Sequence, residues 1–237
     1  MSVADTGKRV VVVGGGLSAR KTAEYIKGDK NISVTLVQGS PFIEWTVAAT
    51  YVLARPELQA QYVAPNPSQF EIPGVTFVYG LATGVGPNGL TVKDHADGTE
   101  QTLPYDALVI ATGFAMPTIV AEPGISLAER TREIAGFNAA VKEAGSIVVG
   151  GGGVIGLELA GDLREVMPPG CKLTVVSSSD VLIPTNPPAE SARALAKLQQ
   201  LGIEVVMGDR VASHDLTALE KGMTLTLKSG KTLSADV

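Results

Sequence analysis

The 237-residue sequence has little of what many catalytic and structural sites are built from. It contains one cysteine, Cys171, and two histidines, His95 and His214. A single cysteine excludes an internal disulfide and any Cys-x-x-Cys redox or zinc motif. Cys171 follows a Pro-Pro-Gly turn at the entry to a strand, where we expect an inert thiol. Both histidines lie in polar stretches, so metal and catalytic-triad chemistry have little support.

Charged residues are also scarce, and the basic ones do not cluster. They make up 18% of the chain, and the net charge is −5. Nucleic-acid binding normally needs clustered lysine and arginine, so no nucleic-acid partner is expected. The sequence also has no run of the about 20 apolar residues that a membrane-spanning helix needs. The first predicted strand begins near residue 9, so we expect no signal or transit peptide within this sequence.

Glycine is plentiful, with 27 residues, and one glycine-rich pattern occurs twice. Each copy has a β-branched apolar run, a glycine turn, a helical stretch and a second apolar strand. The first copy places strands at 8–13 and 33–37 around a helix that ends near 28. The second places strands at 146–150 and 172–176 around a helix that ends near 167. Two such units predict an α/β fold with two Rossmann-like domains and parallel sheets.

The remaining segments complete this organisation. Residues 77–103 predict a small antiparallel β layer with a turn at 87–89. Residues 105–113 predict a buried strand, and Ser126-Leu127-Ala128-Glu129 is a capping box that opens a helix to about 145. A helix at 188–201 and strands at 203–207, 223–227 and 232–237 follow. We therefore expect one domain over 1–116 and a second over 117–237.

A glycine-rich turn between a strand and a helix is an anion-binding site. Glycine lets the backbone approach a pyrophosphate, and the helix N-terminus offers unpaired N–H groups and a positive dipole end. The first copy, Gly14-x-Gly16-x-x-Ala19, meets the looser form of the dinucleotide fingerprint, and the second, Gly151-x-Gly153-x-x-Gly156, meets the strict form. The alternative is that both are close-packed turns without a ligand.

The fingerprint also expects an acidic residue at the end of the second strand, to bind the ribose hydroxyls. The first unit has Gln38 there, and the second has Ser177-Ser178-Ser179. Glutamine still donates and accepts hydrogen bonds but lacks the charge that strengthens them. The three serines suit a ribose 2′-phosphate or a neutral ribose edge, so both NADH and NADPH stay open.

The order of these motifs resembles the two-dinucleotide flavoprotein reductases of the pyridine nucleotide-disulfide oxidoreductase superfamily. Residues 102–113 are similar to the family's Ala-Thr-Gly strand, and Glu158-Leu159-Ala160-Gly161-Asp162 is similar to its E-x-A-G-E motif. The resemblance implies an FAD-binding domain interrupted by an NAD(P)H-binding domain. It implies FAD contacts at Gly14, Gly16, Thr112 and Gly113, pyrophosphate contacts at Gly151, Gly153 and Gly156, and a place for Glu158 near the nicotinamide and the flavin.

Within the family, the stretch 42–49 carries no redox cysteine pair. It is more similar to the apoptosis-inducing-factor-like and ferroptosis-suppressor branch, with type II NADH dehydrogenases next. In that branch electrons pass from NAD(P)H through FAD to a quinone-like or other small acceptor. Tyr51 stands where the branch usually has an arginine. Trp45 and Tyr51 are expected on a helix after the second strand, where aromatics are more often core residues than flavin contacts.

Three functions from different classes remain at this point. The first is an FAD-dependent NAD(P)H oxidoreductase, with Glu158 as its catalytic residue. Since a glutamate in the first turn of a helix is stabilised by the helix dipole alone, Glu158 also has a purely structural interpretation. The second is a non-catalytic accessory subunit of a membrane electron-transfer complex. The third is an NAD(P)-binding module without flavin.

The sequence stops short of the family's usual extent, which leaves an unpaired sheet edge. We therefore expect further chain or a protein partner over that edge. Peripheral membrane association is compatible with either of the first two functions. The compartment stays open between an organelle and the cytoplasm.

Overall fold

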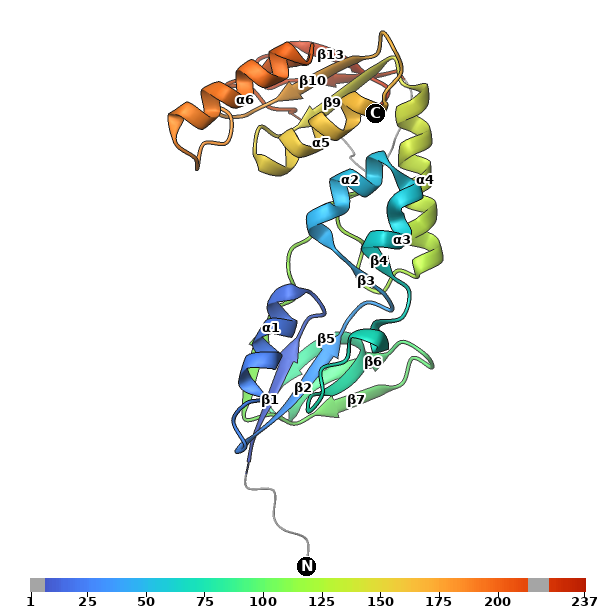
Figure 1. Cartoon of the computed structure of the whole chain (residues 1–237), viewed down its shortest axis with the longest axis vertical. Helices are drawn as coiled ribbons and strands as arrows, with labels where there is room; N and C mark the ends of the chain where they lie inside the picture. Colours follow the sequence, from blue (N-terminus) through green and yellow to red (C-terminus); the bar gives the residue numbers. More distant parts are fainter. Residues whose placement is uncertain (1–6, 213–221) are drawn as a thin grey trace, which may run out of the picture. The chain divides into compact units, whose positions relative to one another are not determined.

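The computed structural model describes residues 7–212 and 222–237, and the chain forms two compact units (Figure 1). The first comprises Met1–Thr46 and Ala60–Arg130, and the second comprises Val47–Gln59 and Thr131–Val237. His214 lies outside the described residues. In the described ranges, no helix is long and apolar enough to cross a lipid bilayer.

The first unit is built on a six-stranded mixed sheet with β1 near one edge (Figure 1). The strand order is β7-β6-β5-β2-β1-β8, and β1 pairs in parallel with both β2 and β8. The helix α1 connects β1 to β2. The elements are β1 (Lys8–Val13), α1 (Leu17–Ile26), β2 (Ile32–Gln38), β5 (Thr76–Gly86), β6 (Gly89–Asp94), β7 (Glu100–Leu103) and β8 (Ala107–Ile110).

The last four residues of β1 are buried on both faces, which explains their unbroken apolar sequence, Val10-Val11-Val12-Val13. Val10 and Val12 pack with Ala19 and Ala23 of α1 on one face. The alternate residues of the strand, Val11 and Val13, pack on the other face with Leu90 and Val92 of β6. The helix and the antiparallel strands therefore cover opposite faces of β1.

Short elements complete the first unit. The strands β3 (Ile43–Glu44) and β4 (Val63–Ala64) form an antiparallel pair. The helix α3 (Gln59–Tyr62) begins at Gln59, where the first segment of the second unit ends, and the 3-10 helix η3 is Pro67–Phe70. Trp45 directly follows β3, and its ring packs edge-on against that of Phe70 with a centroid distance of 5.4 Å. Trp45 is therefore not on a helix, contrary to expectation.

The second unit carries a three-stranded parallel sheet in the order β11-β10-β9 (Figure 1). The end of the chain lies along β9, where Val148 N donates to Val237 O. The elements are η1 (Thr46–Ala48, at the boundary), α2 (Ala49–Ala54), η2 (Pro56–Leu58), α4 (Leu127–Glu143, which begins in the first unit), β9 (Ser146–Gly150), α5 (Val154–Val166), β10 (Lys172–Val176), α6 (Pro188–Gln200), β11 (Glu204–Val206), β12 (Met223–Thr226) and β13 (Thr232–Ala235).

This architecture confirms the predicted α/β fold with parallel sheets and small antiparallel strands. The capping box is also present, since Ser126 N donates to Glu129 Oε2 and Glu129 N to Ser126 Oγ. The strand predicted at 105–113 is shorter and is not buried. It forms only β8, which pairs with β1 alone among the described strands and leaves the side chain of Ile110 69% exposed.

A buried ion pair fixes the segment that follows β8 in the first unit. The Arg130 side chain is 1% exposed and lies 2.9 Å from Glu44 Oε1. Its guanidinium also donates to the carbonyls of Thr118, at 2.9 Å, and Ile119, at 3.0 Å. Thr118 has a positive φ of 68°, a conformation that non-glycine residues rarely adopt. Arg130 therefore fixes the unusual backbone after β8 to the short β3 strand.

We predict that Arg130→Ala lowers the free energy of unfolding of the first unit by about 3–5 kcal/mol, because Glu44 is left buried without its partner. Trp45, the single tryptophan, lies in this unit and reports urea unfolding by its fluorescence. Lys21→Ala, which removes an exposed pair with Glu24, should change the same quantity by less than about 0.5 kcal/mol. A loss below about 1 kcal/mol for Arg130→Ala would contradict the prediction.

Candidate functional site

The turn after β1 has the backbone geometry of an anion site. Gly14 has a φ of +134°, and a Cβ there would lie 2.1 Å from the Ala111 carbonyl oxygen, so only glycine fits. Gly16 is the N-cap of α1 and has no side chain to cap the helix. A Cβ on Gly16 would meet no described heavy atom within 4 Å. The space beside Gly16, at the N-terminus of α1, is therefore open, as the close approach of a pyrophosphate requires.

The end of β8 lies next to this turn. Ala111 N donates to Val13 O at 2.8 Å, which places Thr112 and Gly113 directly beyond the carboxyl end of β1. Both are exposed, and Gly113 has a φ of +82°. Ala19, in the first turn of α1, is fully buried, with its Cβ 3.3 Å from the position of a Cβ on Gly14. The structure thus brings the predicted residues of the first turn and of the β8 end together.

Gln38 occupies the end of β2 but does not offer a free amide. Its side chain is folded against Gly15, where a Cβ would lie 2.1 Å from Gln38 Oε1. The residue is 2% exposed. Its Nε2 donates to the carbonyl oxygens of Ser40, at 3.1 Å, and Phe42, at 3.5 Å. The protein itself therefore satisfies the group that was predicted to meet the ribose.

Arg20 is a residue of this site that the motifs do not identify. It lies in the first turn of α1, and its guanidinium donates to Gly15 O at 2.9 Å and to Gln38 Oε1 at 3.2 Å. Burial lowers its pKa from the ordinary value. A cation near a helix N-terminus opposes the helix dipole, so its presence there was the available signal. Arg20 holds the glycine turn and the strand end together.

The turn after β9 repeats this geometry in the second unit. Gly151 has a φ of +150°. Gly153 is the N-cap of α5, and a Cβ there would meet nothing within 4 Å in the described chain. A Cβ on Gly156 would lie 2.1 Å from Gly151 O, so the third glycine allows the helix to pack against the turn. The three glycines satisfy the three requirements of the dinucleotide fingerprint.

Ser177 stands at the end of β10 as Gln38 stands at the end of β2. It is 2% exposed, and its Oγ would lie 2.4 Å from a Cβ on Gly152. The same oxygen accepts a hydrogen bond from Ser179 N at 3.3 Å. In both units, therefore, the strand-end side chain packs on the middle glycine of the turn.

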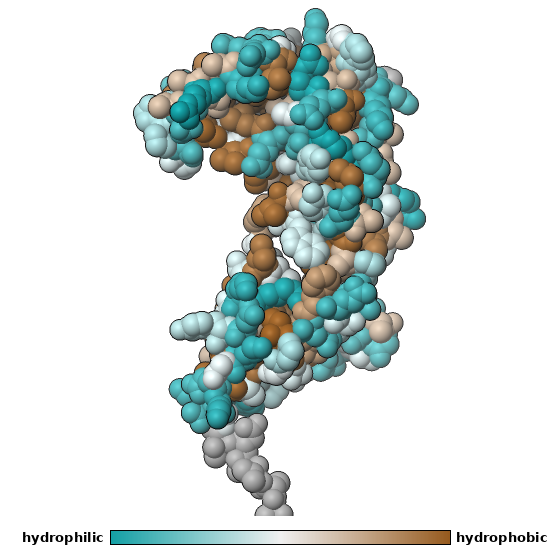
Figure 2. Space-filling view, in the orientation of Figure 1, coloured by the Kyte–Doolittle hydropathy of each residue, from teal (hydrophilic) through white to brown (hydrophobic). Residues whose placement is uncertain are grey.

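Apolar side chains border the second turn. Val154, the first residue of α5, is 51% exposed, and Val181, in the loop after β10, is 46% exposed. Figure 2 shows hydrophobic surface beside the start of α5. The loop after β10 is tied to the turn, since Ile183 N donates to Gly152 O at 2.8 Å. A ring system bound over this turn would rest on apolar surface and exclude water from one side.

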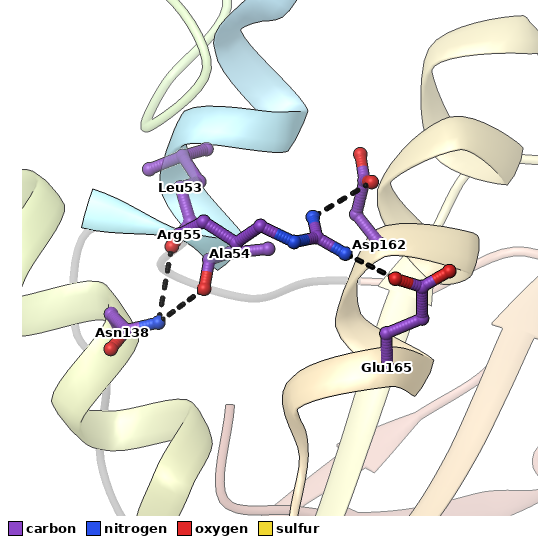
Figure 3. Close-up of polar contacts among 6 residues, drawn as sticks. All are labelled: Leu53, Ala54, Arg55, Asn138, Asp162 and Glu165. Carbon is purple, nitrogen blue, oxygen red and sulfur yellow. Dashed lines mark hydrogen bonds and ion pairs between the residues drawn. The ribbon is translucent and has the colours of Figure 1, made fainter. Parts of the chain in front are cut away.

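Glu158 is exposed on α5, one turn before Asp162 on the same face of the helix. Asp162 pairs with Arg55, whose Nη1 lies 3.2 Å from Asp162 Oδ1, and Arg55 also pairs with Glu165 (Figure 3). Burial acts to lower the pKa of Arg55, but its hydrogen bonds to the two carboxylates prevail and raise it. Asp162, the last residue of the motif 158–162, is therefore paired with a cation of the second unit, whereas Glu158, its first residue, is exposed to solvent.

Arg55 also packs against the ring of Tyr51. Its guanidinium carbon lies 4.3 Å from the centre of the Tyr51 ring. Tyr51 is on α2 as expected, but it is 37% exposed and is a stacking surface rather than a core residue. The Asn138 amide of α4 donates to Ala54 O at 2.7 Å, which fixes the end of α2 (Figure 3). No sequence motif identifies Arg55, because its carboxylate partners Asp162 and Glu165 are 107 and 110 positions away.

Comparisons with known proteins agree with this geometry. The chain is 28% identical to the oxidoreductase ptaL of Pestalotiopsis fici, over 97% of this chain and 64% of that protein. It is 26% identical to apoptosis-inducing factor homolog B of Dictyostelium discoideum, over 88% of this chain and 54% of that protein. Among solved structures, an NAD-dependent persulfide reductase from A. fulgidus matches with a TM-score of 0.71 and 24% identity, over 97% of this chain and 44% of that one.

The chain thus spans between 44% and 64% of the length of these three proteins. The family model described as "pyridine nucleotide-disulphide oxidoreductase" matches residues 8–237. The family and its structural neighbours use FAD and NAD(P)H, which is the cofactor class that the sequence predicted. The two glycine turns and this match over nearly the whole chain show that it belongs to the pyridine nucleotide-disulphide oxidoreductase family.

Proposed function

We propose that the chain is the nucleotide-binding part of an FAD-dependent NAD(P)H oxidoreductase, in which the first unit holds FAD and the second holds NAD(P)H. One observation carries the proposal. Each unit has a positive-φ glycine, then an open glycine at a helix N-terminus, then a small residue packed against the turn. This arrangement is specific to the dinucleotide fingerprint, and a structural turn has no need of the open glycine.

The residues of the first unit fit the pyrophosphate of FAD. Gly16 and the N–H groups of α1 would bind its oxygens, and Gly14 lets Thr112 and Gly113 lie beside them. FAD, when bound, supplies the ability to take two electrons as a hydride from NAD(P)H and to release them to an acceptor. The share of this chain is to bind and orient both nucleotides. The apolar side chains Val154 and Val181 would exclude water at the second site.

The acceptor and the role of Glu158 belong to this proposal. A quinone-like acceptor follows from the similarity of the stretch after β2 to the apoptosis-inducing-factor-like branch. Glu158 is exposed near the start of α5, on the helix whose N-terminus would hold the NAD(P)H pyrophosphate. We assign it a position near the nicotinamide, where its carboxylate would accept a hydrogen bond from the cofactor.

A second function is favoured by the burial and the internal hydrogen bonds of the Gln38 side chain. Its amide is buried and bonded to Arg20, Ser40 and Phe42, so the first unit lacks the usual anchor for the FAD ribose. A family member that has lost flavin would serve as an accessory subunit of a larger electron-transfer assembly. The two functions differ in whether the protein holds flavin.

We predict that the full chain, mixed with excess FAD and desalted, retains flavin absorbance bands near roughly 370 and 450 nm. The pyrophosphate contacts of the first turn should suffice for binding without the ribose acid. Adding NAD(P)H without oxygen should then bleach the 450 nm band. A folded protein that holds no flavin would contradict the oxidoreductase proposal and support the accessory function.

We predict that Gly153→Ala weakens NAD(P)H binding by about tenfold or more, because a methyl group there blocks the approach of the pyrophosphate. A Cβ at this position meets nothing in the described protein, so the free energy of unfolding should change by less than about 1 kcal/mol. Gly161→Ala, on the same helix and equally open, is the control and should leave binding unchanged. Gly16→Ala should weaken FAD binding and leave NAD(P)H binding intact.

Nucleotide fluorescence titration measures these affinities. Equal binding by the protein and its Gly153→Ala variant would rule out the second turn as the NAD(P)H site.

A further inference from the structure

We infer that the second unit is built to recognise the 2′-phosphate of NADPH, through Arg210 and Lys228, and so binds NADPH in preference to NADH. The inference rests on the proposed nucleotide site at Gly151–Gly156 and specifies which nucleotide that site selects. It depends on three features of the described residues around the end of β10: the absence of a strand-end acid, a cavity lined by two cations, and a carboxylate that is fully engaged.

The first feature is the strand end itself. NADH-selective sites place a carboxylate there to accept hydrogen bonds from both ribose hydroxyls, and that carboxylate repels a 2′-phosphate. Residues 177–179 are all serines. Ser177 is buried against Gly152, whereas Ser178 is exposed and lines the adjoining cavity. The site therefore has a hydroxyl donor where a carboxylate would select NADH.

The second feature is the cavity beside Ser178. Its volume is about 470 Å³, and its lining is polar and charged. Arg210 and Lys228 are both exposed, and neither forms an ion pair within residues 7–212 and 222–237. Lys228 N donates to Arg210 O at 2.8 Å, so the backbone holds the two cations side by side. The lining residues are Ser178, Gly208, Asp209, Arg210, Lys228 and Ser229.

The third feature is Asp209, the carboxylate among these residues. It accepts hydrogen bonds from Arg210 N at 2.9 Å, from Ser229 N at 3.2 Å and from the Ser229 hydroxyl. The hydroxyl above all, with the backbone N–H groups, lowers the pKa of Asp209. Asp209 thus joins the loop after β11 to the β12–β13 turn and keeps both cations in place. Among the lining residues, two positive charges therefore accompany one negative charge.

Asp180 is the competing carboxylate. It is exposed, and its Oδ1 would lie 2.6 Å from a Cβ on Gly208. It lines a separate cavity of about 310 Å³ that is bordered by apolar residues, among them Val181 and Met207. Asp180 lies three residues after Ser177, at the end of β10. It is therefore the carboxylate that would have to bind the ribose hydroxyls if this site selected NADH. It therefore provides an internal control.

The experiment compares nucleotides that differ only in the 2′-phosphate. NADPH and NADH, and separately adenosine 2′,5′-bisphosphate and AMP, are titrated into the full chain at two salt concentrations. We expect the 2′-phosphate to strengthen binding by about tenfold or more, with a steeper salt dependence for the phosphorylated member of each pair. These titrations need neither FAD nor turnover.

The variants locate the effect. Arg210→Ala and Lys228→Ala should each weaken NADPH binding by about tenfold and change NADH binding less than about twofold. Ser178→Asp should have the same selective effect, because it places a carboxylate in the cavity. Arg193→Ala, which removes a cation paired with Glu190 on α6 of the same unit, should change neither affinity. Circular dichroism confirms that each variant is folded.

The outcomes separate this inference from the proposed function. Binding of NADH as tight as that of NADPH, or equal losses of both in Arg210→Ala and Lys228→Ala, would overturn the inference alone. A loss of NADH affinity in Asp180→Asn, with no NADPH preference, would assign the selectivity to Asp180 and overturn it as well. If neither nucleotide binds, both the inference and the proposed NAD(P)H site fail.

Discussion

The contact on which both units depend is the close approach of one backbone segment to another at the glycine turn. In the first unit, Gly14 lies against the carbonyl of Ala111, and in the second, Gly156 lies against that of Gly151. A single Cβ at either position would lie 2.1 Å from an oxygen, which no side-chain rearrangement relieves. This approach allows the strand to pass directly into the helix and aims the helix N-terminus at the edge of the sheet. The open helix N-terminus that a nucleotide would contact is therefore a consequence of this close backbone packing.

The two units share this turn but differ in what surrounds it. In the first, Arg20 and Gln38 form a hydrogen-bonded layer beneath the turn and are satisfied by the protein itself. In the second, Ser177 is small, and the cations of the cavity lie farther out, at Arg210 and Lys228. In the proposed function, the same glycine turn would bind a pyrophosphate in each unit, and the strand-end side chains would determine which other groups of the nucleotide are contacted.

The sequence predicted the parts of the fold whose cause is local. The apolar strands, the glycine turns and the capping box at Ser126 each depend on residues within a few positions of one another. The burial of β8 was predicted wrongly, because an apolar run does not reveal whether a strand has neighbours on both sides. Arg55 and Arg130 were not identified as important, since their partners at Asp162 and Glu44 are 107 and 86 positions away. Such pairings depend on the completed fold.

The state of Gln38 makes the first unit the more informative one for function. A carboxylate at this position would face the carbonyl oxygens of Ser40 and Phe42, to which the Gln38 amide now donates. The loop after β2 is therefore adapted to glutamine, and simple restoration of an acid would leave two carbonyls without a donor. In the proposed flavoprotein, the affinity for FAD must come from the turn at Gly16 and from the β8 end. The strand end of β2 then serves to position Arg20 and the turn rather than to bind the ribose.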